Sequence, residues 1–192
     1  TSDEYRLWSE FEPYYLNLDK ENFYKRLEKI FKKDTVKKIA DIYLRDLGDN
    51  QEGNKYKHAL SNLMTDWTFG MHALDLLEQH QDKSYGYFFN EPSPLLDGKL
   101  GAYHSSELPY VFGSANKKFF KDICSEYSDE ISNFFQLSWS QFAKTGSPSS
   151  HLMDWEVYEN NLSITYINSV PKIKTFKNKD RIKLLNESKP NF

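Results

Sequence analysis

The aromatic segment SYGYFF, at residues 84–89, places the strongest constraint on how this chain can fold. Its composition is typical of a buried β-strand, and it runs into a loop that contains Pro92 and Pro94. At most two further strands are predicted, the clearer being LSITYI at residues 162–167. Because a buried strand must hydrogen-bond to neighbours, so few strands cannot close a sheet of their own. The sequence therefore predicts an α/β fold, helix-rich with few strands, that forms part of a larger unit.

Helical periodicity dominates the remainder of the sequence. Apolar residues recur at helical spacing over residues 21–33, 35–47, 56–80 and 129–144. Asp34 is the expected N-cap of the second of these helices, and the third is expected to be interrupted near Gly70. Residues 1–20 are predicted to form a loop with a short helical turn, and residues 90–118 are predicted to be irregular. The tail from Lys172 is basic and then polar.

Composition and charge exclude several classes of protein. Hydrophobic residues make up 39% of the chain and aromatic residues 16%, which is too apolar for a disordered chain. The formal net charge of −3 gives no overall attraction to nucleic acid or to an anionic membrane. No apolar run reaches the length of a membrane span. The single cysteine, Cys124, cannot form a disulfide within the chain, which favours a reducing compartment such as the cytoplasm, although a lone thiol is also compatible with a location outside the cell.

The stretch GAYHSSELPYVFG, at residues 101–113, contains the residue that bears most directly on function. His104 lies in a glycine-flanked loop after the predicted strand, where an imidazole can serve as a general base that a carboxylate orients. A metal site would instead use His104 with Glu107, but Pro109 and the glycines disfavour the helix that this spacing suits. Packing is the commonest role of a histidine taken alone. The residues by themselves leave packing, proton transfer and metal binding open.

Five regions of the sequence resemble one family of enzymes and occur in the same order as in that family. They are TSDE at 1–4, LMTDWTFGMHALDLLEQH at 63–80, SYGYFFNEPSP at 84–94, GAYHSSELPYVFG at 101–113, and SWSQFAKTGSPSS at 138–150 with DWEVY at 154–158. The family is the type B carboxylesterases, the cholinesterase-like branch of the α/β-hydrolases, and within it the sequence resembles the bacterial para-nitrobenzyl esterases. The resemblance covers nearly the whole chain. It implies that residues 1–192 are the C-terminal portion of a single α/β-hydrolase domain.

The resemblance also implies roles for individual residues. It implies that His104 is the general base of a serine esterase, that Glu4 is the carboxylate that orients it, and that Glu107 is a supporting acid behind them. It implies hydrolysis of a small-molecule carboxylic ester without a metal or an organic cofactor. Trp67 and Phe69 are candidates for lining the substrate pocket, although aromatic residues at helical spacing more often belong to a core.

The nucleophile of that family is missing from the sequence. No Gly-x-Ser-x-Gly elbow and no Gly-Gly oxyanion loop occur, and the order of motifs in the family places both before Thr1. The resemblance therefore implies that the N-terminal portion of the same enzyme is the partner of this chain. It also implies that the chain is inactive alone, and it implies neither a nucleic-acid nor a membrane partner.

Two other interpretations belong to different functional classes. Cholinesterase-like domains also serve as non-catalytic binding or adhesion modules that have lost the serine, although the retained Glu4 and His104 argue against this role. The lysine-rich segment at residues 172–183 is a candidate module for binding nucleic acid, although a solvated surface is the commoner role of such a segment.

Two residues depart from the family pattern. The family usually has glycine after the catalytic histidine and after the acidic pair, where this chain has Ser105 and Tyr5. Glycine tolerates a positive φ that other residues adopt only with strain, so we expect strain at either position if its φ is positive.

Overall fold

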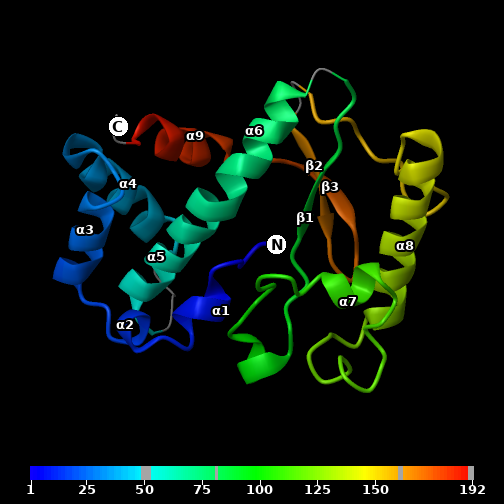
Figure 1. Ribbon diagram of the computed structural model, residues 1–192, viewed down its shortest axis with the longest axis horizontal. Helices are drawn as coiled ribbons and strands as arrows, with labels where there is room; N and C mark the ends of the chain where they lie inside the picture. The colour runs from blue at the N-terminus through cyan, green and yellow to red at the C-terminus, as the bar shows by residue number, and fades with distance from the viewer. Residues whose placement is uncertain (49–52, 81, 160–161, 190–192) are drawn as a thin grey trace. The chain divides into compact units, whose positions relative to one another are not determined.

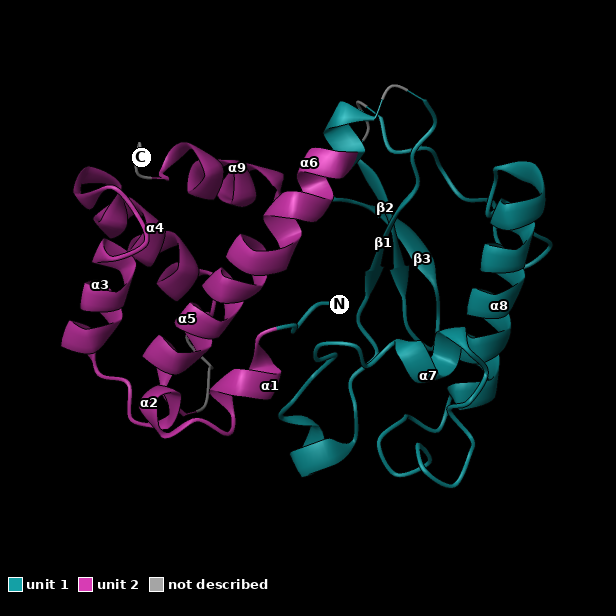
Figure 2. Ribbon diagram, in the orientation of Figure 1, with its two compact units in different colours: residues 1–4, 77–176 teal, residues 5–76, 177–192 magenta. Residues whose placement is uncertain are grey.

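A computed structural model describes residues 1–48, 53–80, 82–159 and 162–189 of the chain (Figure 1). The chain divides into two compact units, which are coloured separately in Figure 2. Unit 1 comprises residues 1–4 and 77–176, and unit 2 comprises residues 5–76 and 177–192. The first four residues therefore belong to the same unit as the predicted histidine loop.

Unit 2 is helical. Its α-helices are α1 (Arg6–Ser9), α2 (Pro13–Leu16), α3 (Lys20–Glu28), α4 (Lys33–Arg45), α5 (Lys55–Thr65) and, from the end of the chain, α9 (Lys179–Glu187). α5 continues through a π-helix, Asp66–Gly70, into α6 (Met71–Gln79), whose residues from Leu77 onward belong to unit 1. The predicted interruption near Gly70 is confirmed, as a π-helical turn between two α-helices.

The core of unit 2 forms where the apolar faces of α3, α4 and α5 meet, with one residue from α9. Its members are buried and include Phe23, Leu27, Val36, Ile39, Tyr43, Leu60, Leu63 and Leu185. The spacing of three and four residues that predicted these helices is what gathers their apolar side chains on one face. Asp19 caps α3, because its side chain accepts a hydrogen bond from the Asn22 backbone N–H at 2.8 Å.

The prediction that Asp34 is the N-cap of α4 is wrong. The helix begins at Lys33, Lys32 occupies the N-cap position, and Asp34 lies in the first turn. An acid in the first turn interacts favourably with the positive end of the helix dipole, so it marks the start of a helix without fixing the residue that begins it. The preceding helix, α3, was predicted to extend to residue 33 but ends at Glu28.

Unit 1 is organised around a three-stranded sheet with the order β1-β2-β3. β1 (Gly86–Phe89) and β2 (Ser163–Ile167) are parallel, with Gly86 opposite Ile164, and both were predicted. β3 (Lys172–Thr175) pairs antiparallel to β2. The strand β3 was missed, because its side chains are mostly exposed and lysine-rich, which is typical of an edge strand and leaves no hydrophobic signal.

Helix α8 (Ser128–Thr145) packs against β1 and supports the end of that strand. The ring of Phe89 lies 5.8 Å from that of Phe135 on α8 and 5.4 Å from that of Tyr110, measured between centroids. Tyr110 belongs to the short helix α7 (Leu108–Val111). These aromatic contacts fix the carboxyl end of β1, from which the histidine loop departs.

The segment from β1 to α7 is a loop that contains a 3-10 turn at Leu95–Gly98. The prediction that residues 90–118 are irregular is therefore only partly correct, because α7 lies within that range. Loops that leave the carboxyl ends of parallel strands are where α/β proteins commonly place functional residues. His104 lies in this loop, four residues before α7 begins at Leu108.

Candidate active site

Left-handed backbone positions lie on either side of His104 in its loop. Gly101 has a φ of 59° and Ser105 has a φ of 64°. Glycine adopts such a conformation freely, whereas a residue with a side chain does so at a cost. Ser105 stands where the family usually has glycine, so the strain expected for this departure is located there. Tyr5, at the other departure, has a φ of −82° and carries no such strain.

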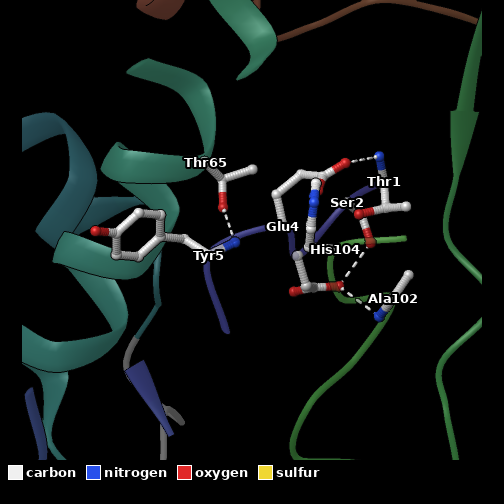
Figure 3. A network of polar contacts seen from close by, with 8 residues as sticks. Thr1, Ser2, Glu4, Tyr5, Thr65, Ala102 and His104 are labelled. Atoms are coloured by element: carbon white, nitrogen blue, oxygen red, sulfur yellow. Dashed lines mark hydrogen bonds and ion pairs between the residues drawn. The ribbon is translucent and has the colours of Figure 1, made fainter. Parts of the chain in front are cut away.

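Glu4 and His104 meet within unit 1, although 100 positions separate them in the sequence (Figure 3). Nδ1 of His104 lies 2.7 Å from Oε2 of Glu4. An ionised carboxylate can only accept hydrogen bonds, so Nδ1 carries the proton and donates it. The neutral imidazole then has Nε2 as its acceptor nitrogen, which is the arrangement that a general base requires.

The members of this pair differ in their exposure. The side chain of Glu4 is 11% exposed, whereas that of His104 is 42% exposed. The carboxylate is therefore shielded from solvent, and the imidazole is accessible from outside the unit.

The ionisation of Glu4 is set by opposing influences. Burial raises the pKa of Glu4, whereas the hydrogen bond from His104 lowers it. That hydrogen bond favours the ionised form of Glu4, whose negative charge in turn favours the imidazolium that forms when His104 accepts a proton.

Backbone hydrogen bonds place the first residues of the chain beside β1 and its loop. The N–H of Ser2 donates to the carbonyl oxygen of Phe89, the last residue of β1, at 2.8 Å. The loop is closed by a bond from the Ser93 N–H to the Gly101 carbonyl at 3.0 Å. Both sets of bonds bring the Glu4 segment and the His104 loop to the same end of the strand.

Glu107 does not share the hydrogen bond between Glu4 and His104. Its Oε2 is buried and has no hydrogen-bond partner among the residues that the structure describes. Burial raises the pKa of Tyr87 to about 12, with further contributions from the negative charges of Glu107 and Glu4. The negative charges of Glu107 and Glu4 thus both raise the pKa of the Tyr87 hydroxyl. The supporting role of Glu107 stays a prediction.

Trp67 and Phe69 make aromatic contacts inside unit 2. The ring of Trp67 lies 4.8 Å from that of Phe31 in a T-shaped arrangement, and Phe69 stacks on Trp8 at 6.5 Å, both measured between centroids. Trp67 packs against the core of unit 2, which was the commoner alternative, and Phe69 is half-buried against Trp8. A role in lining a substrate pocket stays a prediction.

The lysine-rich segment at residues 172–183 contains an arginine whose role sequence reasoning missed. Nη2 and Nε of Arg181 lie 2.6 and 2.7 Å from Oδ2 of Asp66. The hydroxyl of Tyr43 donates to the same oxygen at 2.8 Å, and Nη1 of Arg181 lies 3.1 Å from Asp46. This buried network belongs to unit 2. No local pattern could have revealed it, since Asp66 and Arg181 are 115 positions apart.

No group of three or more His, Cys, Asp or Glu side chains could hold a metal ion in the described parts of the chain. Within them, the pair His104 and Glu107 therefore gains no third ligand. Of the helices described, none is both long enough and apolar enough to cross a bilayer.

Comparison of the sequence with protein families and curated proteins gives concordant matches. The sequence model described as "Carboxylesterase family" matches residues 6–185, a range that includes His104 and begins after Glu4. The para-nitrobenzyl esterase of Bacillus subtilis (strain 168) is 28% identical over 145 residues, which are 73% of this chain and 27% of that enzyme. The bile salt-activated lipase of Rattus norvegicus is 30% identical over 117 residues, which are 57% of this chain and 19% of that protein.

Solved structures resemble the chain over nearly its whole length. A thermophilic PNB esterase superimposes with a TM-score of 0.70 at 24% identity, and the match covers 96% of this chain and 37% of that one. A carboxylesterase of Geobacillus stearothermophilus superimposes with a TM-score of 0.77 at 18% identity, over 95% of this chain and 38% of that one. At these identities the likeness shows the fold, which is that of the α/β-hydrolases. The chain spans well under half the length of each of these relatives.

Proposed function

The chain belongs to the carboxylesterase family, and we propose that it supplies the proton-transfer pair of a serine carboxylesterase. In this proposal His104 is the general base, and Glu4 is the carboxylate that orients it. Residues 1–192 are the C-terminal portion of a single hydrolase domain, and the N-terminal portion of the same enzyme is their partner and supplies the serine. The substrate is a small-molecule carboxylic ester, and the chemistry requires neither a metal nor an organic cofactor.

The observation that carries the proposal is the 2.7 Å hydrogen bond between Nδ1 of His104 and Oε2 of Glu4. It joins a shielded, ionised carboxylate to an accessible imidazole and leaves Nε2 as the proton acceptor. General-base catalysis by histidine requires this combination of tautomer, orientation and access.

In the acylation step, Nε2 of His104 accepts the proton of the serine hydroxyl while the serine oxygen attacks the ester carbonyl. The negative charge of Glu4 stabilises the imidazolium that results. Backbone N–H groups of the N-terminal portion bind the oxyanion of the tetrahedral intermediate. The C–O bond to the alcohol then breaks, Nε2 returns the proton to the departing oxygen, and the acyl group remains on the serine.

In the deacylation step, a water molecule replaces the alcohol. Nε2 of His104 accepts a proton from the water as its oxygen attacks the acyl carbonyl. When the bond to the serine breaks, Nε2 returns the proton to the serine oxygen. One ester and one water thus yield one carboxylic acid and one alcohol, and the enzyme recovers its starting state.

The experiment that tests the proposal uses the intact enzyme, with residues 1–192 joined to their nucleophile-bearing portion. His104→Ala should lower kcat on an aryl ester such as para-nitrophenyl acetate by about 10³- to 10⁴-fold, because the proton acceptor is lost. His151→Ala is the matched control, since His151 is an exposed histidine of the same unit, and it should leave kcat unchanged. Equal activity in the two variants would refute the proposal.

The same assay distinguishes the enzyme from the non-catalytic binding module. Residues 1–192 alone should show no turnover above the buffer rate, because their sequence contains no Gly-x-Ser-x-Gly elbow. A serine in the elbow of the intact protein would support the esterase. A glycine or alanine there, together with an inactive intact protein, would support the binding module instead.

A further inference from the structure

We propose that Asp3 is a positioning residue of the candidate active site, which clamps the His104 loop to the segment that carries Glu4. This inference rests on the proposed function of that pair. The clamp consists of contacts between Asp3 on one segment and the consecutive residues Gly101 and Ala102 on the other.

Asp3 and Ala102 are joined by two hydrogen bonds that run in opposite directions. The N–H of Asp3 donates to the carbonyl oxygen of Ala102 at 3.0 Å, and the N–H of Ala102 donates to Oδ2 of Asp3 at 3.1 Å. The Ser2 hydroxyl donates to the same oxygen at 2.6 Å, and Figure 3 shows the bonds that reach Ser2 and Ala102. Ala102 is 1% exposed, so its N–H would lack a hydrogen-bond acceptor if the carboxylate were removed.

The carboxylate of Asp3 approaches the loop so closely that a side chain at residue 101 would displace it. A Cβ on Gly101 would lie 2.5 Å from Oδ2 and 2.6 Å from Cγ of Asp3, well inside contact distance. Gly101 also has a φ of 59°, which disfavours any other residue. Glycine is therefore favoured here both by the backbone conformation and by the contact with Asp3.

The clamp acts beside both members of the catalytic pair. Asp3 immediately precedes Glu4, and Ala102 lies two positions before His104. Loss of the carboxylate removes the bond from the Ala102 N–H and leaves only the backbone bond between the two segments, at the point where the 2.7 Å bond between His104 and Glu4 has to form. Misplacement of a catalytic group by about 1 Å can cost on the order of 10²-fold in rate. We therefore expect Asp3 to influence kcat through the orientation of His104.

The kinetic test compares Asp3→Ala, Asp3→Asn and Asp154→Ala in the intact enzyme. Asp3→Ala should lower kcat by about 10- to 100-fold and keep KM within about threefold, because orientation and not substrate contact is lost. Asp3→Asn retains an oxygen that accepts from the Ala102 N–H, so its kcat should stay within about threefold of the wild type. Asp154, an exposed carboxylate of the same unit, is the control and should have no effect.

A spectroscopic readout separates positioning from a general loss of stability. An N–H that bonds to a carboxylate gives a proton NMR resonance far downfield, and here that proton is on Nδ1 of His104. The resonance should be lost in Asp3→Ala, as in Glu4→Gln, and should persist in Asp3→Asn.

Gly101→Ala changes the loop residue of the same contact. It replaces Asp3→Ala as the test if that variant does not fold. The added methyl group should displace the Asp3 carboxylate and lower kcat. The loss should be smaller in the Asp3→Ala background, where the methyl group no longer meets a carboxylate. Strictly additive losses would overturn the clamp.

The clamp is also overturned if Asp3→Ala keeps both its kcat and the Nδ1 resonance, or if Asp3→Asn loses as much as Asp3→Ala. His104→Ala and Glu4→Gln are assayed in parallel to keep the two proposals apart. Activity in those variants would refute the proposed function. Their inactivity, together with an active Asp3→Ala, would refute only the role of Asp3.

Discussion

Each unit of this molecule contains a carboxylate bound to a basic side chain from a distant part of the sequence, and the two pairs are enclosed differently. In unit 1, Glu4 lies 2.7 Å from His104, whose side chain is 42% exposed. In unit 2, Asp66 lies 2.6 Å from Arg181, and their side chains are only 8% and 17% exposed. The contact distances are almost the same, so distance alone does not separate a structural pair from a candidate catalytic one.

The difference lies in how far the basic side chain of each pair is exposed. Oδ2 of Asp66 accepts from Tyr43 and from two nitrogens of Arg181, while Arg181 also binds Asp46 and lies 4.8 Å above the ring of Tyr43. The hydrogen bond between His104 and Glu4 is made by Nδ1 of an imidazole that is 42% exposed. An enclosed ion pair stabilises the fold, whereas an accessible imidazole whose Nδ1 donates to a carboxylate is suited to moving a proton.

Burial opposes the ionised form of both carboxylates. It raises the pKa of Asp66 in spite of the charge of Arg181 and the hydrogen bonds from Tyr43 and Arg181. At Glu4 the hydrogen bond from His104 acts against burial and lowers the pKa.

The largest expected effect is on catalysis. Glu4→Gln in the intact enzyme should lower kcat on an aryl ester by about 10³- to 10⁴-fold, because the imidazolium of His104 loses its negative partner. Asp66→Asn should leave kcat per folded molecule within about threefold of the wild type, because the pair in unit 2 takes no part in the chemistry. Steady-state kinetics with active-site titration measures kcat in both variants. Equal losses of kcat would mean that the pairs in the two units do not differ in function.

The next effect is on stability. Arg181→Ala should lower the free energy of unfolding by about 3–5 kcal/mol, because it leaves the buried charge of Asp66 without its partner. Urea denaturation followed by circular dichroism measures the change, and Lys177→Ala, at an exposed lysine of the same unit, is the control. The double variant Asp66→Asn/Arg181→Met should recover part of the loss, because neither charge remains. A double variant less stable than Arg181→Ala would contradict this account.

A smaller effect is the pH dependence of the pair in unit 2. Burial raises the pKa of Asp66, so the stability that its carboxyl group contributes is present below its ordinary pKa and is lost as the pH rises through the raised value in the folded protein. The unfolding free energy of the wild type should therefore fall relative to that of Asp66→Asn as the pH rises above 3.8. Urea titrations at a series of pH values measure the difference, and a difference that is constant with pH would contradict the raised pKa.

The smallest effect concerns the strained residue beside His104. Ser105→Gly should raise the unfolding free energy by about 0.5–1 kcal/mol, because relief of the positive φ exceeds the entropy that glycine loses on folding. Ser140→Gly, at an exposed position inside α8, should lower it by a similar amount. Thermal or urea unfolding compares the two, and a destabilised Ser105→Gly would mean that the serine side chain compensates for the strain.

Local patterns predicted local structure where the apolar signal was strong. The spacing over residues 129–144 predicted α8 to within one residue at each end, and the aromatic run at 84–89 predicted β1. The tail from Lys172 contains β3 and α9, which were not predicted. The exposed side chains of β3 explain its omission, because an edge strand shows little of the hydrophobic alternation from which strands are recognised.

The candidate site was only partly visible in the sequence. His104 stands in a contiguous loop motif, whereas Glu4 was identified only through the family resemblance. Asp3 was not identified at all, because its contact with Ala102 joins residues 99 positions apart. The pair of Asp66 and Arg181 was missed for the same reason.

The sequence by itself determined where most helices and β1 form, because side-chain spacing along a regular backbone decides which residues share a face. It also identified an imidazole in a loop at the end of a strand. The family resemblance identified Glu4, but only the tertiary structure showed it 2.7 Å from that imidazole and decided which of the two pairs is enclosed and which is accessible. Those properties depend on burial and on the meeting of segments distant in the chain, and neither is a function of local spacing.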